Sequence, residues 1–204
     1  MPPSWTEPDA AAPLPSLDRL VASVRRIRFV RGPEVPPALA ELAAILRTVL
    51  DNGGVIAETF AVEDADEVAA WFLSRGNFDT YGLLEQLLRS EPVTSVASGS
   101  GTYDPRAASR TFEQTTPLTL DGDLAGALVW GGAYGRFEGS HADAKRLGLE
   151  VCRQLFGDRW EDVRVHESTA PWSPWFWDVA WDHSWVVTDL RTQQLTLVAL
   201  TDTD

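Results

Sequence analysis

Residues 172–201 read WSPWFWDVAWDHSWVVTDLRTQQLTLVALT and hold the strongest β-strand signal in the chain. Two runs within it, Ser184 to Leu190 and Leu195 to Thr201, are rich in β-branched and apolar residues, with the short polar stretch 191–194 between them. Two such runs around a short polar connection are typical of a β-hairpin. The sequence therefore predicts that they pair antiparallel and anchor a sheet.

Five of the nine tryptophans lie between Trp172 and Trp185. If this segment is one strand, its aromatic residues share one face, and small or acidic residues share the other. One interpretation is an aromatic platform for a ligand or partner, because tryptophan is enriched at binding hot spots. We favour a tryptophan-rich core with Trp177, Trp181 and Trp185 largely buried, because large exposed aromatic patches are unusual in soluble monomers.

The first ninety residues have apolar side chains at helical spacing. Ser16 is placed as the N-cap of a first helix, and Pro37 lies in the first turn of a second. Asp64 and Glu67 form a pair like a capping box at the start of a third. We expect helices at residues 17–27, 37–50, 64–75 and 80–89, with a short strand at 55–60.

The chain changes character after Pro92. There we expect a strand at 93–97, a long polar loop at 98–114, a hairpin or two strands within 118–130 and a helix at 140–156. Ser140 and Asp143 are placed to cap that last helix. The glycine-rich stretch 131–139 would then connect a strand to a helix, a position where backbone amides sometimes bind phosphate. It matches no phosphate-binding fingerprint, so we favour a turn that needs positive φ.

These elements predict an α+β fold, with a helix-rich N-terminal part packed on a mostly antiparallel sheet formed by the C-terminal part. Residues 1–15 contain five prolines and no apolar periodicity, so we expect a flexible tail there. Residues 16–204 are expected to form a single domain. A subdivision near Pro92 is the alternative, but we expect one shared core.

The composition narrows the classes of function. The chain has 204 residues, a formal net charge of −13, one cysteine and a single lysine, Lys145. Phosphate backbones repel such a surface, so we expect no nucleic-acid binding. No apolar run approaches the length of a membrane helix and no signal peptide is visible, so we expect a cytoplasmic protein. Sixteen arginines against one lysine, with many alanines and aspartates, suggest a GC-rich bacterial genome. An acidic surface fits a basic protein partner, although solubility alone explains it.

Few residues are candidates for catalysis, metal binding or ligand binding. The three histidines form no zinc motif, the lone Cys152 lies in an apolar helix, and no serine-hydrolase elbow exists, so we expect no metal and no cofactor. Arg136 in the glycine-rich stretch is a candidate anion contact. Asp178, Asp182 and His183 are candidates for a ligand or partner site if the chain turns at Asp182. The competing interpretation is that Asp182 is a turn residue bonding its own backbone.

These observations lead to two hypotheses of function, which belong to different classes. The first is a non-catalytic protein-binding or inhibitor protein, because small size, acidity, an aromatic-rich sheet and the lack of catalytic motifs are shared by many bacterial inhibitor and immunity proteins. The second is an enzyme or small-ligand-binding protein with its site near Arg136, Asp178, Asp182 and His183. An exposed acidic face favours the first, and a deep pocket lined by these residues favours the second. The sequence does not indicate the oligomeric state.

Overall fold

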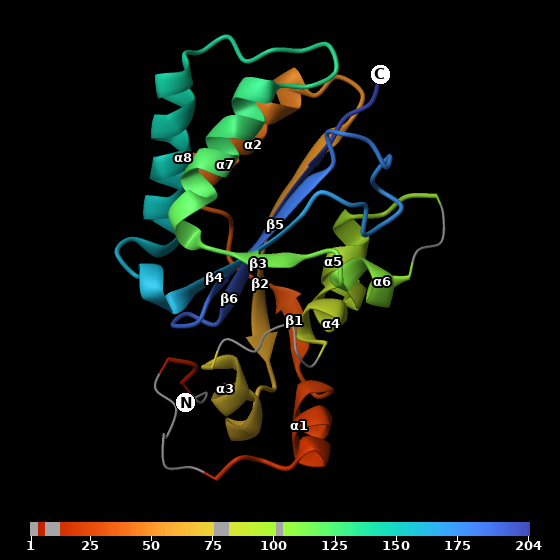
Figure 1. Ribbon diagram of the computed structural model, residues 1–204, viewed down its shortest axis with the longest axis vertical. Coiled ribbons are helices and arrows are strands. Elements are labelled where there is room, and N and C mark those ends of the chain that lie inside the picture. Colours follow the sequence, from red (N-terminus) through yellow and green to blue (C-terminus); the bar gives the residue numbers. More distant parts are fainter. Residues whose placement is uncertain (1–3, 7–12, 76–81, 101–103) are drawn as a thin grey trace.

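The computed structural model describes residues 4–6, 13–75, 82–100 and 104–204. They form an α+β fold around a six-stranded antiparallel sheet with the order β1-β2-β6-β5-β4-β3 (Figure 1), which confirms the predicted fold class. The strands are β1 (Arg28–Arg31), β2 (Gly54–Glu63), β3 (Glu113–Thr115), β4 (Val163–Ser168), β5 (His183–Asp189) and β6 (Gln194–Thr201). Because β1 and β2 precede Pro92, both parts of the chain contribute strands to this sheet.

Helices cover both faces of the sheet. One face carries α2 (Pro37–Val49), α7 (Pro117–Trp130) and α8 (His141–Phe156). The other face carries α1 (Leu17–Val24), α3 (Glu67–Leu73), α4 (Leu83–Arg89), α5 (Glu91–Val96) and α6 (Pro105–Ser109). A 3-10 turn, Trp160–Asp162, precedes β4. In the part of the chain that the structure describes, no helix is long and apolar enough to cross a membrane.

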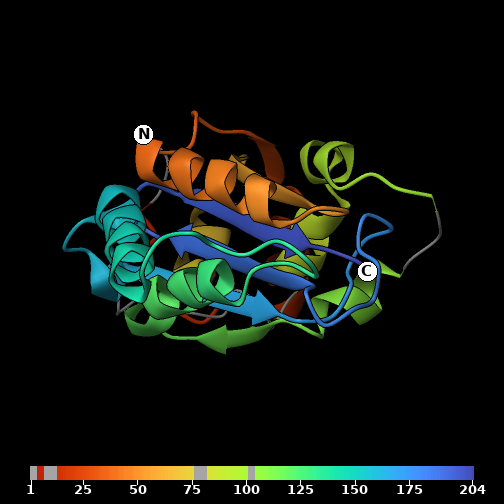
Figure 2. The same ribbon diagram turned by 90° about the horizontal axis from the view of Figure 1, so that it is seen from above.

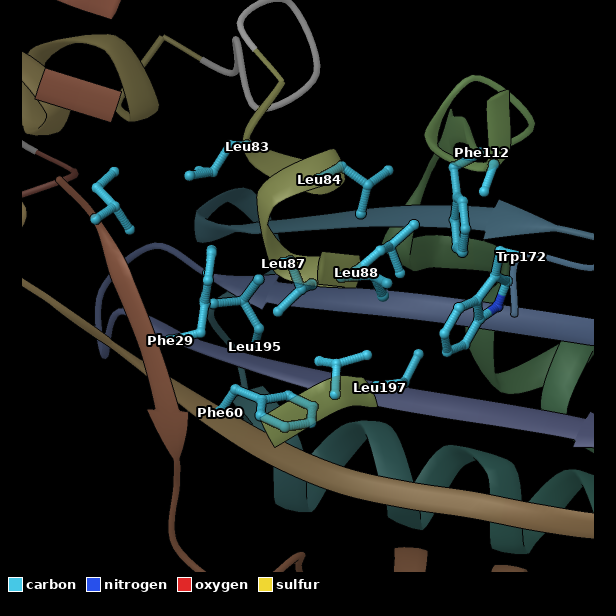
Figure 3. Close-up of a cluster of buried hydrophobic side chains, with 14 of the residues drawn as sticks. Phe29, Phe60, Leu83, Leu84, Leu87, Leu88, Phe112, Trp172, Leu195 and Leu197 are labelled. Carbon is cyan, nitrogen blue, oxygen red and sulfur yellow. The ribbon is translucent and has the colours of Figure 1, made fainter. Parts of the chain in front are cut away.

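The core under α4 joins residues that are far apart in the sequence. Aromatic residues of β1 and β2 meet leucines of α4 and β6 in one apolar cluster (Figure 3). The labelled members are Phe29, Phe60, Leu83, Leu84, Leu87, Leu88, Phe112, Trp172, Leu195 and Leu197. Residues on both sides of Pro92 therefore share this core.

The opposite core lies between the sheet and the three helices α2, α7 and α8. Gly148 lets α8 approach α7 closely, because a side chain there would overlap the carbonyl oxygen of Asp121. Beside that contact, Lys145 Nζ lies 2.7 Å from Asp121 Oδ2. Cys152 is buried here as expected, and burial raises the pKa of its thiol to about 12. The thiol is therefore protonated at neutral pH.

The predicted C-terminal hairpin is confirmed. β5 and β6 pair antiparallel, with Ser184 opposite Ala199 and Asp189 opposite Gln194. The turn is closed by the Asp189 carboxylate, which accepts hydrogen bonds from the backbone N–H groups of Arg191 and Thr192 at 2.9 and 3.1 Å. This pattern of local side-chain bonds is characteristic of aspartate in turns.

Two predicted β segments are helices instead. Residues 93–97 fall mostly in α5, and residues 118–130 fall in α7. The Thr116 side chain caps α7, Pro117 occupies its first turn, and Gly131 ends it at a φ of 70°. The apolar residues of α7 do not follow a clear helical period, so the alternation at Leu118 and Leu120 resembled a strand. As a result, the glycine-rich stretch 131–139 connects two helices rather than a strand and a helix.

The tryptophan-rich segment is not one strand. Residues 169–182 are irregular, and β5 begins only at His183. Two features explain this: prolines at 171 and 174 lack a backbone donor, and Asp178 has a φ of 59°. Trp185 is fully buried as predicted, but Trp177 is 59% exposed and Trp181 is partly exposed. The prediction that these three rings share one buried face was wrong.

Three smaller predictions also need correction. The N-cap of α3 is Asp66 rather than Asp64, because its carboxylate accepts from Val68 N and Ala69 N at 3.1 and 3.0 Å. The segment 98–114 contains α6 and the start of β3, although residues 101–103 lie outside the described residues. Of the expected N-terminal tail, residues 1–3 and 7–12 lie outside the described residues, whereas Trp5 is fully buried in the core.

Candidate functional site

Several connections meet at one end of the sheet, which we call the loop end. It consists of residues 50–53, 97–100, 131–139, 169–182 and 202–204. Figure 1 shows it in the upper part of the molecule, near the C-terminus, and Figure 2 looks onto it from above. Antiparallel pairing brings the start of β2 and the end of β6 together here, with Gly54 opposite Thr201.

A buried carboxylate holds two of these connections together. Asp202 is fully buried, and its Oδ1 and Oδ2 accept hydrogen bonds from Asn52 N at 2.9 Å and Ala133 N at 2.8 Å. The side chain of Asn52 donates in turn to Thr203 O at 2.9 Å. Gly132 lies against Asp202, since a side chain there would overlap the carboxylate. The glycine-rich stretch is therefore part of the scaffold of the loop end.

Asp182, one of the predicted site residues, has a structural role. It is buried, and its Oδ1 accepts from Thr201 Oγ1 at 2.5 Å. Its Oδ2 accepts from Val179 N at 3.1 Å, while Asp182 N donates to Val179 O at 3.0 Å. Asp182 is thus a turn residue that bonds its own backbone, which was the competing interpretation of the sequence.

Arg136 is occupied by its own loop. Its Nη1 donates to Gly132 O at 2.5 Å and to Gly135 O at 2.7 Å. The side chain also lines a shallow groove of about 370 Å³ beside α2, together with Phe137 and Glu138. A guanidinium engaged by two carbonyl oxygens has fewer donors left for an anion.

Asp178 and His183 have different environments. Asp178 is exposed on the loop end. His183, at the first position of β5, stacks on Trp185 with ring centroids 3.9 Å apart. Of the four predicted site residues, only Arg136 lines one of the best-defined cavities in the described residues. The four residues lie at the start of β5, in the turn before it and in the glycine-rich stretch, and they do not share one of these cavities.

A cluster of titratable side chains, which the sequence did not predict, lies beside His183. Glu167 lies opposite Trp185 on β4, and its Oε2 is 3.9 Å from His183 Nε2. Burial raises the pKa of Glu167, the charges of Asp123 on α7 and Glu113 on β3 add to this, and the nearby Trp185 indole opposes it. Burial lowers the pKa of His183, which Asp123 opposes. Both groups are therefore driven toward their neutral forms.

Three exposed aromatic side chains lie in the segments of the loop end or directly next to them. Trp130 ends α7, Tyr134 follows in the next connection, and Trp177 projects from 169–182; their exposed fractions are 69%, 64% and 59%. The exposed carboxylates of this end are Asp51, Glu138, Asp178 and Asp204. Within the segments that define the loop end, Arg136 is the only cation. The end is therefore aromatic and acidic.

The loop end also contains a cavity of about 450 Å³. It is lined by Asn52, Gly53, Ser98, Gly99, Ser100, Pro174, Trp175, Phe176, Trp177 and Thr201. The sequence favoured Trp177 as a core residue over an aromatic binding platform, and it did not place Asn52 or Ser98 near it. These residues come together through the antiparallel sheet and the path of 169–182, which no local signal specifies.

Comparison of the chain with protein-family models, with characterised proteins and with solved structures gave no match.

Proposed function

We propose that this chain is a non-catalytic binding protein whose loop end docks on a basic protein partner. The observation that carries the proposal is the exposure of Trp130, Tyr134 and Trp177 at the end where carboxylates are exposed and the one arginine is engaged by backbone carbonyls. Exposed indole and phenol rings are the commonest anchors of protein interfaces. Isolated exposed aromatic residues need no explanation, but three at one end of a molecule do.

The charge of the chain supports the same kind of partner. With a net charge of −13, the protein attracts basic surfaces over distances of about a Debye length, ~8 Å at physiological salt. The exposed carboxylates Asp51, Glu138 and Asp178 belong to the same end of the molecule and supply the matching sign of charge. Complementary charges accelerate encounter and exclude other partners, while the aromatic anchors provide affinity.

The alternative of an enzyme or ligand site near Arg136, Asp178, Asp182 and His183 has less support. Asp182 is buried in a turn, and Arg136 is bonded to its own loop. His183 packs on Trp185 and faces a carboxylate that is itself driven toward its neutral form. These roles already explain the residues without a substrate.

The test compares capture of proteins from the native host by three forms of the full chain. These are the natural protein, the loop-end variant Trp130→Ser with Tyr134→Ser, and the control variant Leu118→Ser with Leu149→Ser. The two control leucines are exposed on α7 and α8, away from the loop end. All three forms are expected to fold, because the changed side chains are exposed.

We expect one basic protein to be enriched by the natural protein and by the control variant, and lost with the loop-end variant. Its association rate, measured with the purified pair, should fall steeply as salt increases. A partner retained by the loop-end variant, or one whose association ignores salt, would overturn the proposal.

A further inference from the structure

The cavity in the loop end has an unusual lining for so acidic a protein. In a chain with 30 acidic and 17 basic residues, none of the ten residues that line this cavity of about 450 Å³ is charged. Its lining combines aromatic rings with hydroxyl and amide groups. Small-molecule sites typically occupy about 300–1,000 Å³ and combine apolar walls with a few placed polar groups.

One wall of the cavity is aromatic. Trp175 and Phe176 meet edge to face with ring centroids 4.9 Å apart, and Phe176 packs in the same way on Trp172 at 5.1 Å. This places two of the wall residues against the main core. Trp177 follows directly and is largely exposed, so its ring is free to cover a ligand. The aromatic wall therefore consists of Trp175 and Phe176, which pack against the core, and Trp177, which is exposed.

The other lining residues offer hydrogen-bonding groups. The hydroxyls of Ser98 and Ser100 make no hydrogen bond to the part of the chain that the structure describes, so both are available to donate and accept. Thr201 Oγ1 donates to Asp182 and keeps acceptor capacity. Asn52 donates its backbone and side-chain N–H groups to Asp202 and Thr203, which fixes its position.

Two glycines allow this arrangement. A side chain at Gly99 would overlap the carbonyl oxygen of Pro174, and one at Gly53 would overlap that of Thr201. The 97–100 connection can therefore lie against residues 174–175, and the α2–β2 turn against the end of β6. Close approach of backbones is a common reason for glycine at a binding site.

We propose that this cavity binds a neutral sugar of one or two pyranose rings. A pyranose presents an apolar C–H face that fits against indole and phenyl rings, and hydroxyl groups at its rim that pair with serine, threonine and asparagine. The lack of any charge in the lining disfavours phosphorylated sugars, nucleotides, sugar acids and amino acids, whose charges would lose hydration without gaining a partner. The site shares Trp177 with the proposed docking surface, and the two proposals are therefore tested at different residues.

The test measures binding of neutral sugars to the purified full-length chain by saturation-transfer NMR and calorimetry. The panel contains glucose, galactose, mannose and N-acetylglucosamine, with maltose, cellobiose, lactose and chitobiose. Glucose 6-phosphate and glucuronate serve as charged counterparts. At least one neutral sugar is expected to bind, with its C–H protons saturated from aromatic side chains, and the matching charged sugar is expected to bind at least about tenfold more weakly.

Variants then locate the site. Trp177→Ala should weaken binding at least about tenfold, and Ser98→Ala or Ser100→Ala about two- to tenfold, the loss expected for one neutral hydrogen bond. Trp130→Ala, at another exposed tryptophan of the loop end, should bind the sugar like the natural protein. Because Trp177, Ser98 and Ser100 lie on the surface, each variant should unfold at the same urea concentration as the natural protein.

The inference would be overturned if no sugar of the panel bound at about 50 mM, or if binding persisted in Trp177→Ala. Preferential binding of a charged counterpart would also overturn it. Since sugar binding uses Trp177 and the proposed protein docking is tested at Trp130 and Tyr134, either proposal can fail while the other stands.

Discussion

Two parts of the same tryptophan-rich segment have opposite environments. Trp172 and Trp185 are buried at its ends, and the Nε1 of Trp172 donates to Ser184 Oγ at 2.8 Å within the core. Trp177, between them, is mostly exposed on the loop end. Residue type alone therefore does not decide burial. Trp185 lies on β5 and Trp172 is bonded to Ser184 of the same strand, while Trp177 lies in the irregular segment 169–182, before the turn closed by Asp182.

The largest expected effect contrasts Trp185 with Trp177. Trp185→Ala should lower the free energy of unfolding by about 3–5 kcal/mol, because it removes a large ring from a packed core between β5 and the helices. Trp177→Ala should change it by no more than about 0.5 kcal/mol, because the side chain is mostly exposed. Urea denaturation of the two variants measures both. Equal losses would mean that Trp177 belongs to the core and would remove the basis of both binding proposals.

The same contrast shows what sequence reasoning can predict. The hairpin of β5 and β6, the helix α2 and the capping box of α8 were predictable because their signals are local: a short polar turn, Pro37 in a first turn, and Ser140 with Asp143. α7 was not predicted, although Thr116, Pro117 and Gly131 are local signals of a helix. Its mostly apolar sequence hides the helical period, and its contact with α8 at Gly148 is tertiary.

The candidate site was predictable only in part. The alternative role of Asp182 as a turn residue followed from aspartate chemistry and is confirmed. The neighbours of His183 were not predictable, because Glu167 reaches it through strand register and Asp123 through the packing of α7. The cavity beside Trp177 is lined by residues of three connections, and more than forty residues separate each connection from the next. No short window of sequence therefore contains the cavity.

A second, smaller contrast is between two aspartates near the C-terminus. Asp202→Ala should lower the free energy of unfolding by about 2 kcal/mol, because it leaves the buried N–H groups of Asn52 and Ala133 without their acceptor. Asp204→Ala, at an exposed position, should have an effect within about 0.5 kcal/mol. Thermal unfolding of both variants at one pH tests this. If Asp202→Ala melted like the natural protein, the carboxylate would not be what holds the loop end together.

A third contrast uses pH at the start of β5. The pKa of His183 lies below its usual 6.5 because of burial, so below that pH the unfolded chain binds more protons at this residue than the folded chain. The stability of the natural protein should therefore fall as pH decreases from about 7 to 5 by more than that of His183→Gln. The raised pKa of Glu167 acts in the opposite direction above 4.5, and comparing the two proteins largely cancels it. Urea denaturation at both pH values checks the sign. A steeper loss in the variant would contradict it.

The smallest expected effect concerns Asp178, the exposed residue at the turn that carries Trp177 outward. Its φ of 59° is in the left-handed region, which costs an L-residue about 1 kcal/mol or more relative to glycine. Asp178→Gly relieves that cost but adds freedom to the unfolded chain, worth about 0.5–1 kcal/mol. The net gain in the free energy of unfolding should be a few tenths of a kcal/mol, whereas Asp178→Val should lose more than about 1 kcal/mol because β-branched residues tolerate this region poorly. Urea denaturation of both variants resolves the order. A loss in Asp178→Gly similar to that in Asp178→Val would show that the Asp178 carboxylate, rather than the backbone, maintains the turn that exposes Trp177.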